Sequence, residues 1–479
     1  MFLYNQDEYL DTSSPNHDDA SMAKLLRSLP KRRQGLAGRL SYVYDSRYLA
    51  EVNFGYNGSE NFAKGNRWGF FPSFAVGYVL SEEEYWKNIK PVISHLKLRG
   101  SYGLKGNDQI GSDRFIYMSE LDLQHGDREF TTGVEQGTNN KGPKYIRYGN
   151  NEITWEIGYQ YNIGADIQLF NDINIMIDAF REIRKNIFLE RQTIPNYMGT
   201  GDIKSFGNLG EVRNHGFDFA IDYNKQFGKD LFISFKSTFT YAANKIQRYD
   251  EPLFRLYPNL SRVGHSVNQQ LMYIADRLFI DDAEVANSPT QQLGGVIQAG
   301  DIKYIDQLNR YGEADGQIDG SDRVYTGHPT VPEIVYGFGP SIQWKKWDFS
   351  FFFQGVGRTS LLMSGFHPFG TQSINNVLQF VADDYWSINN QNIHAAYPRL
   401  SQIDNKNNTE NSTYWLRDAS FLKLKNAEVG YRHKFMRFYV SGTNLLTFSR
   451  FKHWDPEQGG GAGLKYPTTR VVNFGVQVS

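Results

Sequence analysis

The sequence predicts an all-β fold in which antiparallel strands form part of a transmembrane β-barrel, and three observations lead to this prediction. Apolar and polar residues alternate with a period of two along many segments. These segments come in pairs joined by tight turns, and the connections are alternately short and long. Because successive side chains of a strand point to opposite faces, each pair has one apolar, aromatic-rich face and one polar face, which is typical of strands between lipid and water.

The first hairpin, over residues 35–57, shows the alternation clearly. Leu40 and Val52 belong to its apolar face, whereas Arg39 and Asn53 belong to its polar face. The residues on the polar faces would line a wet interior. The same alternation predicts further apolar sets: Leu96, Leu98, Tyr102 and Leu104; Tyr159, Tyr161, Ile163, Ala165, Ile167 and Leu169; and Leu231, Ile233, Phe235, Phe239 and Tyr241.

Composition agrees with a membrane protein that crosses the bilayer with strands. The 479 residues have a mean hydropathy of −0.54, and no segment approaches the roughly 18 consecutive apolar residues of a spanning helix. Aromatic residues make up 15% of the chain, which suits the belts that barrels place at both membrane interfaces. The 51 basic and 52 acidic residues nearly cancel, so no nucleic-acid surface is expected. The absence of cysteine excludes disulfides, thiolate metal sites and thiol catalysis.

The number of predicted strands bears on the architecture. In bacterial outer-membrane barrels short turns face the periplasm and long loops face outward, so residues 1–34 are expected to be an extracellular loop and residues 35–479 the C-terminal part of a barrel. An odd number of antiparallel strands cannot close on itself, so a longer chain would supply the rest. Thirteen strands are predicted, at residues 35–44, 47–57, 69–80, 94–105, 155–169, 173–190, 213–224, 230–246, 332–344, 347–358, 418–432, 436–447 and 469–479.

Several stretches of sequence, in order along nearly the whole chain, resemble one family. The chain resembles the C-terminal half of a SusC/RagA-type TonB-dependent outer-membrane transporter. The similar stretches include LPKRRQGLAGRLSYVYDSRYLAEVNFGYNGSENF at 29–62, RWGFFPSFAVGYVLSEEEYW at 67–86, LKLRGSYGLKGND at 96–108, VYGFGPSIQWKKWDFSFFFQGVG at 335–357, YVSGTNLLTFSRF at 439–451 and YPTTRVVNFGVQV at 466–478.

This resemblance implies a function, a location and partners. Transporters of this family import oligosaccharides or peptides across the outer membrane of Bacteroidota through a barrel of about 22 strands with a plugged lumen. A SusD-like surface lipoprotein captures the cargo, and the TonB complex supplies energy by pulling on the plug. The signal sequence, the plug and the early strands have no counterpart in this sequence. The resemblance therefore implies one part of an importer, set in outer-membrane lipid.

One acidic segment has the spacing of a calcium loop. Counting back from Asp322 as a twelfth-position ligand places Asp319 at position nine, Asp315 at five and Glu313 at three, around a glycine turn. Tyr311 then falls at position one, where it is a poor ligand. The alternative is a solvated turn closed by hydrogen bonds from side chains to backbone. Calcium is the one cofactor that the sequence suggests.

Two loop aromatics are candidates for substrate contact. Tyr385 and Trp386 lie in a long outer connection, where aromatic faces stack well on sugar rings or peptide side chains. The alternative is that they pack this loop against a lid lipoprotein or against its own neighbours.

Catalysis is not expected. The ten histidines are scattered, and the sequence has no HExxH, no Gly-x-Ser-x-Gly and no Walker-type phosphate loop. The run Gly459 to Gly461 would give slack to the loop before the last strand. The alternative to a transporter is a soluble β-rich glycan-binding or glycan-cleaving protein whose apolar faces pack sheet on sheet.

Overall fold

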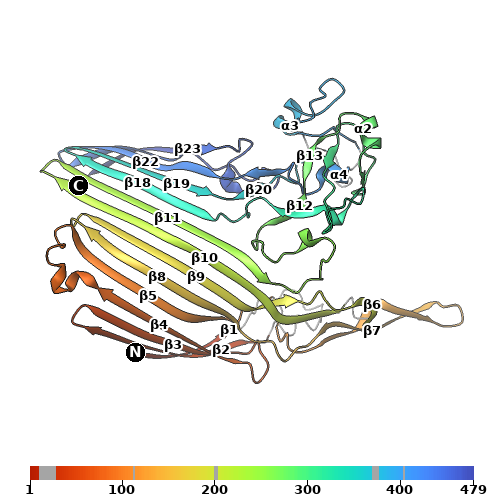
Figure 1. Ribbon diagram of the computed structural model, residues 1–479, viewed down its shortest axis with the longest axis horizontal. Coiled ribbons are helices and arrows are strands. Elements are labelled where there is room, and N and C mark those ends of the chain that lie inside the picture. The colour runs from red at the N-terminus through yellow and green to blue at the C-terminus, as the bar shows by residue number, and fades with distance from the viewer. Residues whose placement is uncertain (10–28, 112–113, 199–202, 369–376, 403–404, 479) are drawn as a thin grey trace. The chain divides into compact units, whose positions relative to one another are not determined.

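The computed structural model describes residues 1–9, 29–111, 114–198, 203–368, 377–402 and 405–478 (Figure 1). The fold is all-β and is built on one large sheet. Within the described residues, fourteen strands follow one another along its main path. These strands are, in order, β1 (Phe2–Tyr9), β2 (Lys31–Tyr44), β3 (Tyr48–Ser59), β4 (Trp68–Val79), β5 (Ile93–Asn107), β8 (Glu156–Leu169), β9 (Ile173–Glu190), β10 (Lys204–Phe227), β11 (Leu231–Arg248), β18 (Ile334–Trp344), β19 (Trp347–Gly357), β22 (Phe421–His433), β23 (Met436–Ser449) and β24 (Val471–Val478).

All thirteen predicted strands are present in this sheet. The largest difference in a boundary is at β10, which begins at Lys204 rather than at residue 213. The tight turn between β2 and β3 also forms as predicted: Asp45 and Ser46 have φ of 52° and 53°, a left-handed conformation that matches the twist of paired strands. Closure into a barrel is not observed, since β1 and β24 each have one neighbour among the described residues.

The prediction of a loop over residues 1–34 is wrong for its first part. Phe2 to Tyr9 form β1, which pairs antiparallel with β2 from Phe2 opposite Gly38 to Tyr9 opposite Lys31. Residues 10–28 lie outside the described residues. The odd strand count on which the parity argument depended is therefore wrong as well. The alternation rule missed β1 because the second half of the segment is polar and acidic.

A second hairpin also escaped the sequence analysis. Strands β6 (Glu120–Thr132) and β7 (Thr138–Tyr148) pair with each other, and β7 pairs in parallel with the start of β10 (Figure 1). The register between β6 and β7 shifts at three points, so the side chains do not keep one strict alternation. A period of two could not reveal such a hairpin.

Shorter elements lie in the connections. None of the described helices is long and apolar enough to cross a membrane. The short strands are β12 (Gln270–Tyr273), β13 (Ala275–Leu278), β14 (Thr290–Gln291), β15 (Ile302–Tyr304), β16 (Gln317–Ile318), β17 (Arg323–Thr326), β20 (Ser360–Leu362) and β21 (Leu416–Asp418). The helices are α2 (Asp282–Ala286), α3 (Gln379–Asp383) and α4 (Lys406–Thr409), with 3-10 turns η1 (Leu80–Glu82), η2 (Glu84–Trp86), η3 (Asn196–Met198), η4 (Pro258–Leu260), η5 (Gly320–Asp322) and η6 (Pro456–Gln458).

The chain divides into two compact units. Unit 1 contains residues 1–167, 178–215 and 244–252, and unit 2 contains residues 168–177, 216–243 and 253–479. Each unit has its own apolar cluster of buried side chains. The cluster of unit 1 is small and is formed by Phe62, Ile110, Ile116, Ile153 and Trp155.

Candidate functional site

One face of the strands carries exposed apolar side chains. Leu40, Val52, Phe74 and Tyr102 lie opposite one another on β2 to β5 and form one cross-strand row. Leu40 is 71% exposed, and Phe474 on β24 is 80% exposed. Proteins surrounded by water rarely expose contiguous apolar surface of this extent, so the face needs an apolar partner. This row is the apolar face that alternation predicted.

The opposite face of the strands is polar and carries ion pairs. Arg99 on β5 donates hydrogen bonds to both carboxylate oxygens of Asp178 on β9 at 2.6 Å, and to Asp166 on β8 at 3.2 Å. In unit 2, Arg437 on β23 donates to Asp348 on β19, two strands away, at 3.0 Å. Such charge-assisted bonds hold neighbouring strands in register. The polar face is suited to a water-filled interior.

Unit 2 also contains a folded module made of connections. We call residues 253–333, 358–368, 377–402, 405–420 and 450–470 the loop module. Its apolar residues pack together and exclude water, as in a small soluble domain. The buried cluster consists of Tyr273, Leu278, Ile302, Tyr304, Ile318, Leu361, Met363, Phe366, Val381, Trp386, Ala395, Tyr397, Trp415, Ala419 and Phe451.

A buried polar network joins the separate connections of the loop module. Asp301, which is fully buried, accepts hydrogen bonds from Asn405 at 3.1 Å and Asn408 at 2.8 Å, and its carboxylate lies 2.8 Å from the guanidinium of Arg399. Burial raises the pKa of Asp301, and Arg399 opposes that rise. A buried charge is tolerated only when it is paired in this way. The network therefore fixes the connection before β18 against the connection before β22.

The acidic segment predicted as a calcium loop forms a hydrogen-bonded turn. Asp319 caps η5 by accepting from the backbone N–H of Ser321 at 2.8 Å, and the buried Asp322 accepts from the N–H groups of Asp319 and Gln307, both at 2.7 Å. Asp315 accepts from a backbone N–H in the same way. These carboxylates therefore accept hydrogen bonds from the backbone. This is the alternative that the sequence left open, a turn closed by side-chain to backbone hydrogen bonds.

The four predicted ligands are not brought together as a metal centre. Glu313 lies next to Asn309, whose amide it approaches at 3.3 Å. Among the described residues no group of three or more acidic or histidine side chains is arranged to hold a metal ion. The spacing reproduced the glycine turn of a calcium loop but not the convergence of its oxygens.

The two predicted aromatics pack within the loop module. Trp386 is 7% exposed, its backbone N–H donates to the carbonyl of Tyr397 at 3.0 Å, and its ring packs against Gly300. A substrate cannot stack on a ring that is already buried. Tyr385 is partly buried against the same cluster. The prediction of substrate contact is therefore wrong for Trp386, and packing against loop neighbours is what the structure shows.

A cavity of about 500 Å³ was not anticipated from the sequence. It lies in unit 2 between strand residues such as Gln354 and Val356 on β19 and loop-module residues such as Leu361 and Gly460. The only signal for it was the glycine run, whose small residues leave room. Its one acidic lining residue, Glu457, is paired by lysines from β22 at 2.6 to 2.7 Å. The cavity is thus lined mainly by apolar atoms, and its one acidic residue is neutralised.

Comparison with protein families identifies the fold. The model of the family described as "TonB dependent receptor-like, beta-barrel" matches residues 3–445. This chain belongs to that family. The match begins inside β1, in agreement with the strand that alternation missed. The family consists of outer-membrane receptors and transporters rather than enzymes, so the soluble glycan-binding alternative does not hold. The apolar face of the strands accordingly faces membrane lipid.

Curated relatives show how much of a complete receptor the chain represents. TonB-dependent receptor P3 from Formosa agariphila is 27% identical over 438 residues, which are 88% of this chain and 41% of the relative. TonB-dependent receptor SusC from Bacteroides thetaiotaomicron is 24% identical over 469 residues, which are 91% of this chain and 42% of the relative. The chain thus spans less than half the length of these relatives.

Solved structures support the same fold. The structure of the RagAB peptide importer in its open-open state superposes with a TM-score of 0.71 at 19% identity, covering 94% of this chain and 47% of that chain. The closed-closed state gives a TM-score of 0.69. At this level of identity the likeness establishes the fold alone.

Proposed function

We propose that this chain forms the C-terminal part of the barrel wall of an outer-membrane importer that takes up oligosaccharides or peptides. The observation that carries the proposal is the exposed apolar face of strands whose other face is polar and ion-paired, in a chain of the TonB-dependent receptor family. The apolar face contacts lipid, and the polar face borders the path of the cargo. A plug domain outside these 479 residues would couple the importer to the TonB complex.

The loop module is suited to meet a surface lipoprotein of the SusD type. It is made of long connections, which lie at the outer end of an outer-membrane barrel. Its own buried core and the network around Asp301 give it a fixed surface, and rigid surfaces bind partners with less loss of entropy than flexible loops. SusC is similar to this chain in sequence, and the RagAB peptide importer is similar to it in fold.

Uptake by cells that express the complete transporter tests the proposal. Labelled neutral oligosaccharides and labelled oligopeptides are offered separately, with and without an uncoupler of the proton gradient. We expect one class to accumulate, and the accumulation to stop with the uncoupler and with deletion of the lipoprotein gene. Uptake of neither class, or uptake that ignores the uncoupler, would contradict the proposal.

The cavity beside β19 provides a sharper version of the test. Gln354→Trp fills the cavity from the polar face, and Ser73→Trp makes the same change on the polar face of β4 in unit 1. If the cavity touches the cargo, uptake falls severalfold in the first variant and less in the second. Both variants should reach the outer membrane in equal amounts, which immunoblotting of membrane fractions measures.

A further inference from the structure

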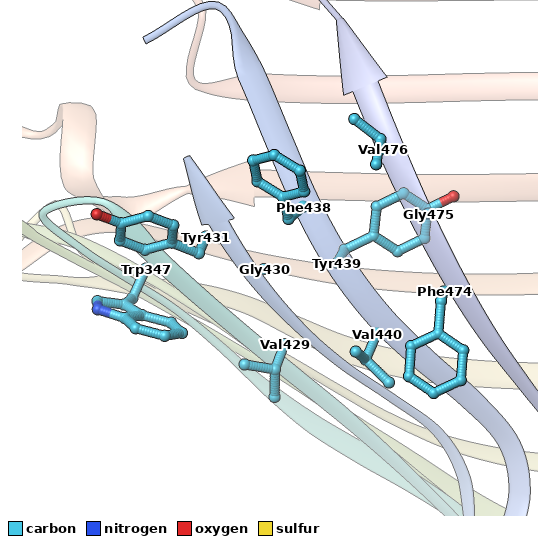
Figure 2. A pocket seen from close by; sticks show the side chains of 10 residues that line it. All are labelled: Trp347, Val429, Gly430, Tyr431, Phe438, Tyr439, Val440, Phe474, Gly475 and Val476. Atoms are coloured by element: carbon cyan, nitrogen blue, oxygen red, sulfur yellow. The ribbon is translucent and has the colours of Figure 1, made fainter. Parts of the chain in front are cut away.

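An apolar groove lies on the outer face of the last strands of unit 2. Figure 2 shows the residues that line it, and its volume is about 450 Å³. One wall is the cross-strand row of Trp347, Tyr431, Phe438 and Val476 on β19, β22, β23 and β24. The other wall is the parallel row of Val429, Val440 and Phe474.

The floor of the groove is backbone. Gly430, Tyr439 and Gly475 form the row between the two walls, and alternation points this row to the polar face. The ring of Tyr439 lies over Gly475 there, where an added Cβ would meet it. Nothing from this middle row projects into the groove, so it stays open between two apolar ridges.

Unpaired cations stand at one end of this groove. Lys345 and Lys346 form the turn between β18 and β19, directly before Trp347, and Lys434 lies in the turn between β22 and β23. All three lysines are exposed and make no ion pair with the described residues. The two turns are neighbours, because the backbone N–H of Arg432 donates to the carbonyl of Lys346 at 2.7 Å.

The same end also carries aromatic residues of the outer face. The ammonium of Lys345 lies 5.8 Å from the ring centre of Trp344, a side chain that is 51% exposed. Of the two lysines where β10 turns into β11, Lys225 is paired with Asp172 at 2.6 Å, whereas Lys229 is exposed and makes no ion pair with the described residues. Three unpaired lysines therefore lie beside the groove, and Lys229 lies one turn away, where the backbone N–H of Lys345 donates to the carbonyl of Asp230 at 2.7 Å.

We propose that this groove and its lysines form a binding site for an anionic phospholipid. The groove takes an acyl chain, and Lys345, Lys346 and Lys434 hold the phosphate. An apolar channel that ends in unpaired cations complements a molecule with an anionic head and a hydrocarbon tail, and basic clusters beside membrane surfaces attract anionic lipids. Long lysine side chains reach along apolar surface while their ammonium groups remain at the interface. A free phosphate ion would gain nothing from the apolar rows.

Lipid retained by the complete transporter tests this site. The protein is purified in detergent after incorporation into vesicles of phosphatidylglycerol and phosphatidylethanolamine, and the bound lipid is measured by native mass spectrometry. The variant K345Q/K346Q/K434Q removes three charges beside the groove and keeps long polar side chains. We expect it to retain roughly tenfold less phosphatidylglycerol.

Matched controls separate the site from general effects of charge. The variant K64Q/K141Q/K452Q removes the same charge from exposed positions that belong neither to the groove lining nor to the two turns beside it. Val440→Trp fills the groove, and Val76→Trp places the same side chain on the apolar face of β4. Loss of phosphatidylglycerol in the turn-lysine and Val440 variants, but in neither control, supports the proposal.

Three outcomes would overturn the proposal. Equal loss in the control lysine variant would show attraction by net charge alone. Displacement of the lipid by inorganic phosphate would show an ion site, and unchanged retention in Val440→Trp would show that no acyl chain occupies the groove. None of these readouts depends on transport, so failure here is distinguishable from failure of the proposed function.

Discussion

The strands of the sheet and the loop module treat the same types of residue in opposite ways. Ile163 on β8 is 69% exposed and Phe474 on β24 is 80% exposed, whereas Ile302 and Leu278 in the loop module are fully buried. Large apolar side chains are thus exposed on the strands and buried in the loop module. The difference shows that the two regions have different surroundings: the strands present apolar side chains to lipid, and the loop module hides them from water.

The largest effect is expected in the core of the loop module. Trp415 is 1% exposed, and its indole N–H donates to the carbonyl of Asn408 at 2.9 Å. Trp415→Ala should destabilise the module by about 3 to 5 kcal/mol, because it leaves a cavity and an unpaired carbonyl. Hydrogen exchange should show faster exchange in the module and unchanged protection in the strands.

Trp344→Ala provides the control for that prediction. Trp344 is a half-exposed indole on the apolar face of β18, so its removal should leave the protection of the loop module unchanged. Equal loosening of the module by both changes would show that the two regions do not differ as described.

A smaller effect is expected at the acidic turn of the loop module. Asp319→Ala removes the cap of η5 and should cost about 1 kcal/mol, whereas Asp319→Asn keeps an accepting oxygen and should cost less. Thermal melting with calcium and with a chelator should give the same difference between the two variants. A difference that depends on calcium would show that the carboxylates bind an ion as well as the backbone.

The smallest effect is a dependence on pH. Hydrogen bonds from Arg277 lower the pKa of Glu284 from its ordinary value of 4.5 to about 2. Since the folded state favours the ionised form, this contribution is present above pH 4.5 and is lost as the pH falls towards 2. Tryptophan fluorescence during melting should show less stability at low pH, and Glu284→Gln should flatten that part of the curve.

Alternation predicted the parts of the fold whose two faces meet different surroundings. It located β2 to β5 and the later strands because lipid on one side and water on the other impose a period of two. It missed β1, whose second half is polar, and the hairpin of β6 and β7, whose register shifts. The long connections have no such pair of faces, so they were harder to predict than the strands that they join.

The candidate sites were harder to predict than the strands, because spacing does not show whether a side chain is already occupied by local hydrogen bonds or buried by another segment. The spacing from Glu313 to Asp322 reproduces a calcium loop, yet the carboxylates bond to nearby backbone N–H groups. Trp386 lies in an outer connection, yet contacts with Gly300 and Tyr397 bury it. Gly300 is far from Trp386 in sequence, so periodicity and spacing contain no information about this contact.

The most direct test of the two surroundings compares adjacent residues on β3. In the complete transporter refolded into lipid, Val52→Arg places a charge on the apolar face and should cost about 2 to 4 kcal/mol near the membrane midplane. Asn53→Arg places the same charge on the polar face, beside Arg39 and Ser73, and should cost much less. Measured free energies of unfolding that fall equally in the two variants would contradict the assignment of one face to lipid and the other to water.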